Sequence, residues 1–183
     1  MQRFKFLAIL SLSMLVSPVM AHPEPVQEIQ TAQGVVEFER LFEAVSEPGE
    51  SLDAFVLRVA PHLRDYSDAT GFEACGVLAT DGERFGVVVG STRAHAGCGS
   101  FLEAVPAGMK PTGETIHSHR QGGLYRANEN DRTLLGLRPG KQFETGPADE
   151  FSREDFHAPG YLVGARGVWH QAGRRTARQV GSL

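Results

Sequence analysis

The stretch FEACGVLATDGERFGVVVGS, residues 72–91, is the clearest structural signal in this chain. Two apolar runs rich in strand-forming residues flank the four residues TDGE. The dipeptide Asp81-Gly82 favours the tight turn that joins two antiparallel strands. The pattern therefore predicts a β-hairpin, and with it a sheet around which the rest of the chain is organised.

A helix is predicted on the N-terminal side of this hairpin. Ser51 is a suitable N-cap, and Asp53 places negative charge in the first turn. An apolar stripe follows at helical spacing, formed by Leu52, Phe55, Val56, Val59 and Leu63. Pro61 interrupts the stripe and predicts either a kink or a restarted turn. The helix is expected to end within residues 67–71.

The N-terminal segment divides into two parts. Residues 1–21 have the layout of a secretory signal peptide, in which positive residues precede an apolar run, with cleavage expected after Ala21. Residues 22–50 are expected to form a leader, loose and polar at first, whose residues 35–45 fit a strand or a short helix equally well. The mature chain is therefore expected in the periplasm or outside the cell, with no stable membrane span.

On the C-terminal side, ETIHSH at residues 114–119 predicts another strand. Residues 120–150 lack periodicity, and a loop of that length is usually functional or mobile. FSREDFHAPG at residues 151–160 predicts a short helix, and residues 161–171 predict a second hairpin. The order of elements predicts one α+β domain over residues 51–173, three-layer α/β-like, with a mixed sheet flanked by helices.

Charge patterning excludes one class of partner. The formal net charge is −4, and the 18 basic and 22 acidic residues are mixed along the chain. This mixture predicts no nucleic-acid-binding face, because such a face needs clustered positive charge. The C-terminal tail, residues 174–183, starts with a short basic run and is expected to be solvated.

The chain has two cysteines, Cys75 and Cys98, both in the mature part. In an oxidising compartment a pair of cysteines predicts a Cys75–Cys98 disulfide. The alternative is a thiol nucleophile, although no histidine is adjacent in sequence to the strand that carries Cys75.

His117 and His119 suggest a metal site. Residues i and i+2 of a strand point to the same face, so the two imidazoles would form a pair of metal ligands. Asp155, in SRED, is the candidate third ligand. Glu73 stands at the start of an apolar strand, where burial would raise the pKa of its carboxyl and suit it to act as a general base.

These residues resemble a known family. Glu73 opening EACGVL, then HSH at 117–119, then S-x-x-D at 152–155 is similar to the signature of the JAB/MPN (JAMM) zinc metalloproteases, and most to their bacterial secreted branch. The resemblance implies a JAB/MPN cytidine-deaminase-like core, in which His117, His119 and Asp155 hold zinc and Glu73 acts as acid and base. It also implies that Ser152 hydrogen-bonds the oxyanion or supports the water.

The sequence departs from the family pattern at two places. Arg120 follows the second histidine, where proline is common. Ser152 stands 33 positions after His119, farther than is usual, so residues 120–150 would form an insertion between the ligands. Such an insertion could cover the cleft as a flap.

The expected activity is hydrolysis of an amide, peptide or isopeptide bond, in a peptide or a peptidoglycan-like substrate. Two alternatives stay open: a non-catalytic binding or scaffold module of the same fold, and a secreted effector or toxin. Two imidazoles and one carboxylate suit zinc, and they also suit iron or manganese. The sequence does not identify a protein partner.

Overall fold

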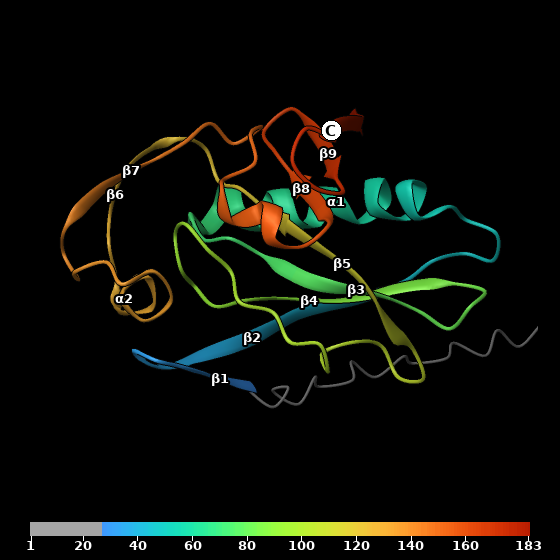
Figure 1. Cartoon of the computed structure of the whole chain (residues 1–183), viewed down its shortest axis with the longest axis horizontal. Helices are drawn as coiled ribbons and strands as arrows, with labels where there is room; N and C mark the ends of the chain where they lie inside the picture. Colours follow the sequence, from blue (N-terminus) through green and yellow to red (C-terminus); the bar gives the residue numbers. More distant parts are fainter. Residues whose placement is uncertain (1–26) are drawn as a thin grey trace, which may run out of the picture.

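The computed structural model describes residues 27–183 (Figure 1). The elements, in chain order, are β1 (Gln27–Thr31), β2 (Gly34–Val45), α1 (Leu52–Thr70), β3 (Cys75–Thr80), β4 (Phe85–Ser91), β5 (Lys110–Ser118), β6 (Gly123–Arg126), α2 (Glu129–Leu135), β7 (Gln142–Thr145), the 3-10 helix η1 (Glu154–His157), β8 (Gly160–Val163), β9 (Gly167–Gln171) and β10 (Arg178–Ser182).

Eight strands form one sheet in the order β1-β2-β4-β3-β5-β8-β9-β10. Neighbouring strands are antiparallel except β5 and β8, which are parallel. The strands β6 and β7 pair separately. Within residues 27–183, a large mixed sheet with two α-helices confirms the predicted α+β class.

Helix α1 covers one face of the large sheet (Figure 1). The Ser51 hydroxyl accepts a hydrogen bond from the Ala54 N–H, as the predicted N-cap should. Gly71 ends the helix in the left-handed conformation, with φ of 75°. Pro61 lies inside α1, which continues on both sides of it. The predicted apolar stripe packs on the sheet, and Phe55, Val56, Val59 and Leu63 are at most 2% exposed.

The predicted hairpin at residues 72–91 is confirmed. Strands β3 and β4 pair antiparallel, and Asp81 lies in the turn, where its carboxylate accepts the backbone N–H groups of Glu83 and Arg84. Side chains alternate across β3, so Leu78 joins the core under α1, whereas Cys75 joins a smaller cluster on the opposite face.

The N-terminal prediction needs a correction. Residues 35–45, which fitted a strand or a helix, belong to strand β2. Residues 27–31, expected to be part of a loose leader, form β1 and pair with the first half of β2. The polar residues of β1 concealed this pairing, since an edge strand needs few buried side chains. The predicted signal peptide and its cleavage after Ala21 lie outside the described residues.

The C-terminal half adds two corrections. Residues 120–150 are not one irregular loop, because they contain β6, α2 and β7. Helix α2 starts with a capping box between Asn128 and Asp131, a short local signal that leaves no periodic pattern. The predicted hairpin at residues 161–171 is confirmed as β8 and β9. The tail is exposed over residues 174–178, as expected, but residues 178–182 form the edge strand β10.

Candidate active site

The two histidines of HSH lie at the C-terminal end of β5 and on the same side of the sheet. Ser118 between them points to the other face, where its hydroxyl lies 2.6 Å from that of Ser67 in α1 and accepts the Ala74 N–H at 3.0 Å. With Ser118 and the buried Ile116 directed toward the core under α1, the imidazoles of His117 and His119 face away from it. Their ring centroids are 5.0 Å apart.

The backbone of His119 is held on both sides beyond the end of the strand. Its N–H donates to the Val163 carbonyl at 3.1 Å, and its own carbonyl accepts a hydrogen bond from the buried Arg64 of α1. The position of the second imidazole is therefore set by the helix and by β8, and not by strand pairing alone.

Asp155 reaches the histidines from the 3-10 helix η1. The Ser152 N–H donates to Asp155 Oδ2 at 2.6 Å, and the Asp155 N–H donates back to Ser152 Oγ at 3.4 Å. This reciprocal pair has the hydrogen-bond pattern of the capping box that S-x-x-D favours, although Ser152 lies one residue before Arg153, the N-cap of η1. Gln171 of β9, 1% exposed, donates to the Asp155 carbonyl at 2.7 Å. The same motif therefore begins a helical turn and orients the carboxylate.

His117, His119 and Asp155 form a group that could hold a metal ion. One ligand atom from each lies within 4.8 Å of the others. Asp155 Oδ1 is 3.3 Å from His117 Nε2, and Asp155 Oδ2 is 3.5 Å from His119 Nε2. Yet His117 Nε2 is buried and has no hydrogen-bond partner among residues 27–183. A buried nitrogen directed toward a carboxylate without bonding it fits a shared cation between them.

The electrostatics of Asp155 favour its charged form. Burial by itself raises the pKa of this carboxyl, but the neighbouring His117 and His119 outweigh burial and hold the pKa well below its ordinary value. A carboxylate that stays ionised is the form that ligates a metal.

Glu73 lies just before β3, and its backbone is fixed by two hydrogen bonds. Its N–H donates to the Ala94 carbonyl at 3.1 Å, and its carbonyl accepts the Ser91 hydroxyl at 2.7 Å. The residue is 7% exposed, and its carboxyl makes no hydrogen bond within residues 27–183, where charged neighbours act on it only through space. Burial raises the pKa of Glu73 to about 8, although His119 and Arg120 act in the opposite direction.

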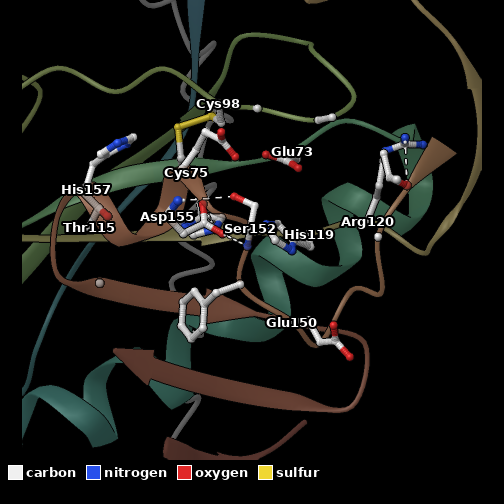
Figure 2. Close-up of a pocket in the computed structure, with 18 of the residues that line it drawn as sticks. Glu73, Cys75, Cys98, Thr115, His119, Arg120, Glu150, Ser152, Asp155 and His157 are labelled. Carbon is white, nitrogen blue, oxygen red and sulfur yellow. Dashed lines mark hydrogen bonds and ion pairs between the residues drawn. A yellow bond between two sulfur atoms is a disulfide. The ribbon is translucent and has the colours of Figure 1, made fainter. Parts of the chain in front are cut away.

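One cavity of about 610 Å³ brings the predicted residues together (Figure 2). Its lining includes all five residues expected in the site: Glu73, His117, His119, Ser152 and Asp155. It also includes Leu135, Glu144 and Thr145 from the insertion, which no sequence signal indicated. The insertion therefore supplies part of the cavity wall.

The predicted disulfide is confirmed, with Cα atoms of Cys75 and Cys98 5.9 Å apart. Both cysteines line the cavity (Figure 2). The disulfide attaches the loop around Cys98 to strand β3, next to the histidines. Since neither sulfur is a free thiol, the alternative of a thiol nucleophile does not apply to this oxidised chain.

Arg120 connects the segment of residues 120–150 to the site. Its guanidinium donates to the His95 carbonyl and to the Thr145 hydroxyl, and lies over the Tyr125 ring. The residue is 2% exposed, and burial lowers its pKa to about 10. Asp131 of α2, fully buried, accepts the His95 N–H and contacts its ring nitrogen at 2.6 Å.

Comparisons with known proteins found no relative. No family model, curated protein or solved structure matches this chain. Within the described residues, no helix has the length and apolar composition needed to cross a membrane.

Proposed function

We propose that this protein is a metal-dependent hydrolase that cleaves an amide bond in a peptide or peptidoglycan-like substrate. One observation carries the proposal: the ligand atoms of His117, His119 and Asp155 converge in the same cavity that the unpartnered Glu73 lines. Two imidazoles and one carboxylate are a common ligand set of hydrolytic zinc sites, which leave a position open for water.

Zinc is the metal that we propose, held by His117, His119 and Asp155, while iron and manganese accept the same donors. When bound, zinc would polarise the scissile carbonyl and lower the pKa of water. Asp155 would be held in place for this role, since the Ser152 N–H fixes one of its two carboxylate oxygens.

Glu73 would act as the acid and base. A carboxyl whose pKa is raised to about 8 exchanges protons readily near neutral pH. It would accept the proton of the attacking water and deliver it to the leaving amine. The absence of a hydrogen bond to this carboxyl among residues 27–183 supports the role, because the carboxyl is not committed to another group.

Ser152 would stabilise the negative charge that develops on the carbonyl oxygen. Its Oγ accepts a hydrogen bond from the Asp155 N–H, which leaves its own O–H free to donate. A single hydrogen-bond donor beside the developing oxyanion stabilises the transition state by about 3 kcal/mol.

The likeness to the JAB/MPN metalloproteases supports the same reaction. A glutamate at the start of a strand, HSH at the end of a strand and S-x-x-D at a helical turn follow in the family's order. A scaffold module is less well supported, since a buried carboxyl without a partner is costly and a scaffold has no use for it. The disulfide is compatible with secretion, and we propose the periplasm or the outside of the cell.

Elemental analysis of the mature chain, wild type beside His119→Ala, tests the proposal. We expect about one zinc per wild-type chain and almost none in the variant. Amide hydrolysis is then screened with peptides and peptidoglycan fragments, with Glu73→Gln as a control that keeps the metal and loses turnover. A folded wild-type protein that takes up no metal, even when zinc is supplied, would overturn the proposal.

A further inference from the structure

Three glutamates lie at the rim of the cavity. Glu144 belongs to β7, Glu150 precedes Ser152, and Glu154 begins η1. All three line the cavity and are exposed. Among residues 27–183 none of their carboxylates forms an ion pair or a hydrogen bond, whereas Glu50, Glu39 and Glu129 elsewhere pair with arginines. Figure 2 labels Glu150 at the edge of the site.

The cationic groups of the cavity do not neutralise this rim. The Arg120 guanidinium also lines the cavity, and its Nη1 has no partner among residues 27–183. It lies buried against the Tyr125 ring, donates to His95 and Thr145, and supplies one positive charge against the three carboxylates. His117 and His119 face Asp155. His157 also lines the cavity, but one imidazole carries at most one charge against three carboxylates.

A second observation points to a ligand in the interior of the cavity. Glu73 is more than nine-tenths buried, its carboxyl makes no hydrogen bond among residues 27–183, and it lines the same cavity (Figure 2). A buried polar group without a partner inside the protein indicates a ligand or solvent group on the cavity side. The rim therefore presents three carboxylates, and the interior presents one carboxyl, largely protonated near neutral pH, whose carbonyl oxygen can accept a hydrogen bond from an ammonium group.

The apolar part of the wall narrows the choice of ligand. Leu135, at 40% exposure, lines the cavity together with Pro147 and Phe151. A side chain with an aliphatic stem and a positively charged end places its stem on such apolar surface and keeps its end among polar groups. An acidic substrate would instead meet three like charges, which disfavours binding.

We propose that the cavity selects a peptide-like substrate that carries a free primary amine, as a lysine-type side chain does, next to the amide to be cleaved. Glu144, Glu150 and Glu154 face the ammonium group, and Leu135 contacts the aliphatic stem. The cleavage part of this inference rests on the proposed function. The binding of the amine does not, since the three glutamates are not metal ligands.

Fluorescence anisotropy of labelled peptides tests the inference. The probes are fluorescein-labelled Ala-Ala-Lys-Ala-Ala, its Nε-acetyl-lysine form, and Ala-Ala-Glu-Ala-Ala. They are titrated with the mature chain at low ionic strength, in chelator, so that no hydrolysis occurs. The test variant is Glu144→Gln/Glu150→Gln/Glu154→Gln. The matched control is Glu28→Gln/Glu37→Gln/Glu83→Gln, which changes the net charge equally at exposed positions outside the cavity.

The wild type should bind the lysine peptide about three- to tenfold more tightly than the acetyl-lysine peptide, and the glutamate peptide least. The rim variant should lose that preference, and the control variant should keep it. Equal binding of the three peptides, binding of none, or a preference for the glutamate peptide overturns the inference. Zinc content is measured in parallel. If the wild type binds zinc but shows no preference for the lysine peptide, only this inference fails. If it prefers the lysine peptide but binds no zinc, only the proposed hydrolase function fails.

Discussion

Cys75 lies directly opposite His117 across the antiparallel pair of β5 and β3. The disulfide to Cys98 therefore begins beside a candidate metal ligand, and it holds the loop that contains Ala96, Gly97 and Cys98 against the cavity. The disulfide and the candidate metal site lie on the same face of the sheet. The disulfide should therefore help to hold the shape of the cavity around the candidate metal ligands.

The first prediction concerns this disulfide. Cys75→Ser/Cys98→Ser should lower the free energy of unfolding by about 3 kcal/mol, because a bond that spans 23 positions restricts the unfolded chain. Urea denaturation of the oxidised wild type and the variant measures the difference. Reduced wild type serves as the control and should match the variant. An unchanged denaturation midpoint would contradict a stabilising role.

The second prediction concerns the pH dependence of stability. Between pH 4.5 and about 8 the folded, metal-free chain keeps a proton on Glu73 that the unfolded chain has released. The free energy of unfolding should therefore fall as pH rises through this window, by at most about 5 kcal/mol. Glu73→Gln should remove the decrease and be more stable than the wild type at pH 8. Urea titrations in chelator at several pH values test this, and parallel curves for the two proteins would refute it.

The third prediction concerns Arg120. Arg120→Ala removes the donor to His95 and Thr145 and the contact with Tyr125, so the β6–β7 pair should detach from the site wall. The expected cost is about 1–3 kcal/mol. Hydrogen exchange should become faster over residues 123–145, with zinc content unchanged. Arg126→Ala, an exposed arginine on β6, is the matched control and should leave exchange at the site unaltered.

The fourth prediction separates the two roles of Ser152. Ser152→Ala removes the hydroxyl but keeps the backbone N–H that holds Asp155, so zinc content should stay near the wild-type value. Amide hydrolysis should fall about 100-fold, because the donor to the developing oxyanion is lost. Ser100→Ala, at another serine of the cavity, should keep most activity. If zinc and activity fell together in Ser152→Ala, the serine would be only a structural cap.

Local patterns were sufficient for several elements. Ser51, the apolar stripe after it and the Asp81-Gly82 turn predicted α1 and the β3–β4 hairpin, because caps and turns are determined by residues close in sequence. The alternation of HSH likewise predicted two imidazoles on one face. The insertion was harder to predict, since its elements of four to seven residues are too short for a periodic signal.

The sequence by itself determined the α+β class, the disulfide and the residues capable of ligating a metal. Only the tertiary structure decided that Asp155, 36 positions after His119 in the sequence, lies beside the two histidines. It also decided that Glu73 lines the same cavity. It also decided that Arg120, Asp131 and His95 join the insertion to the cavity wall. The physical reason is that a short motif records local geometry, whereas burial and contacts between distant strands depend on how the whole sheet packs.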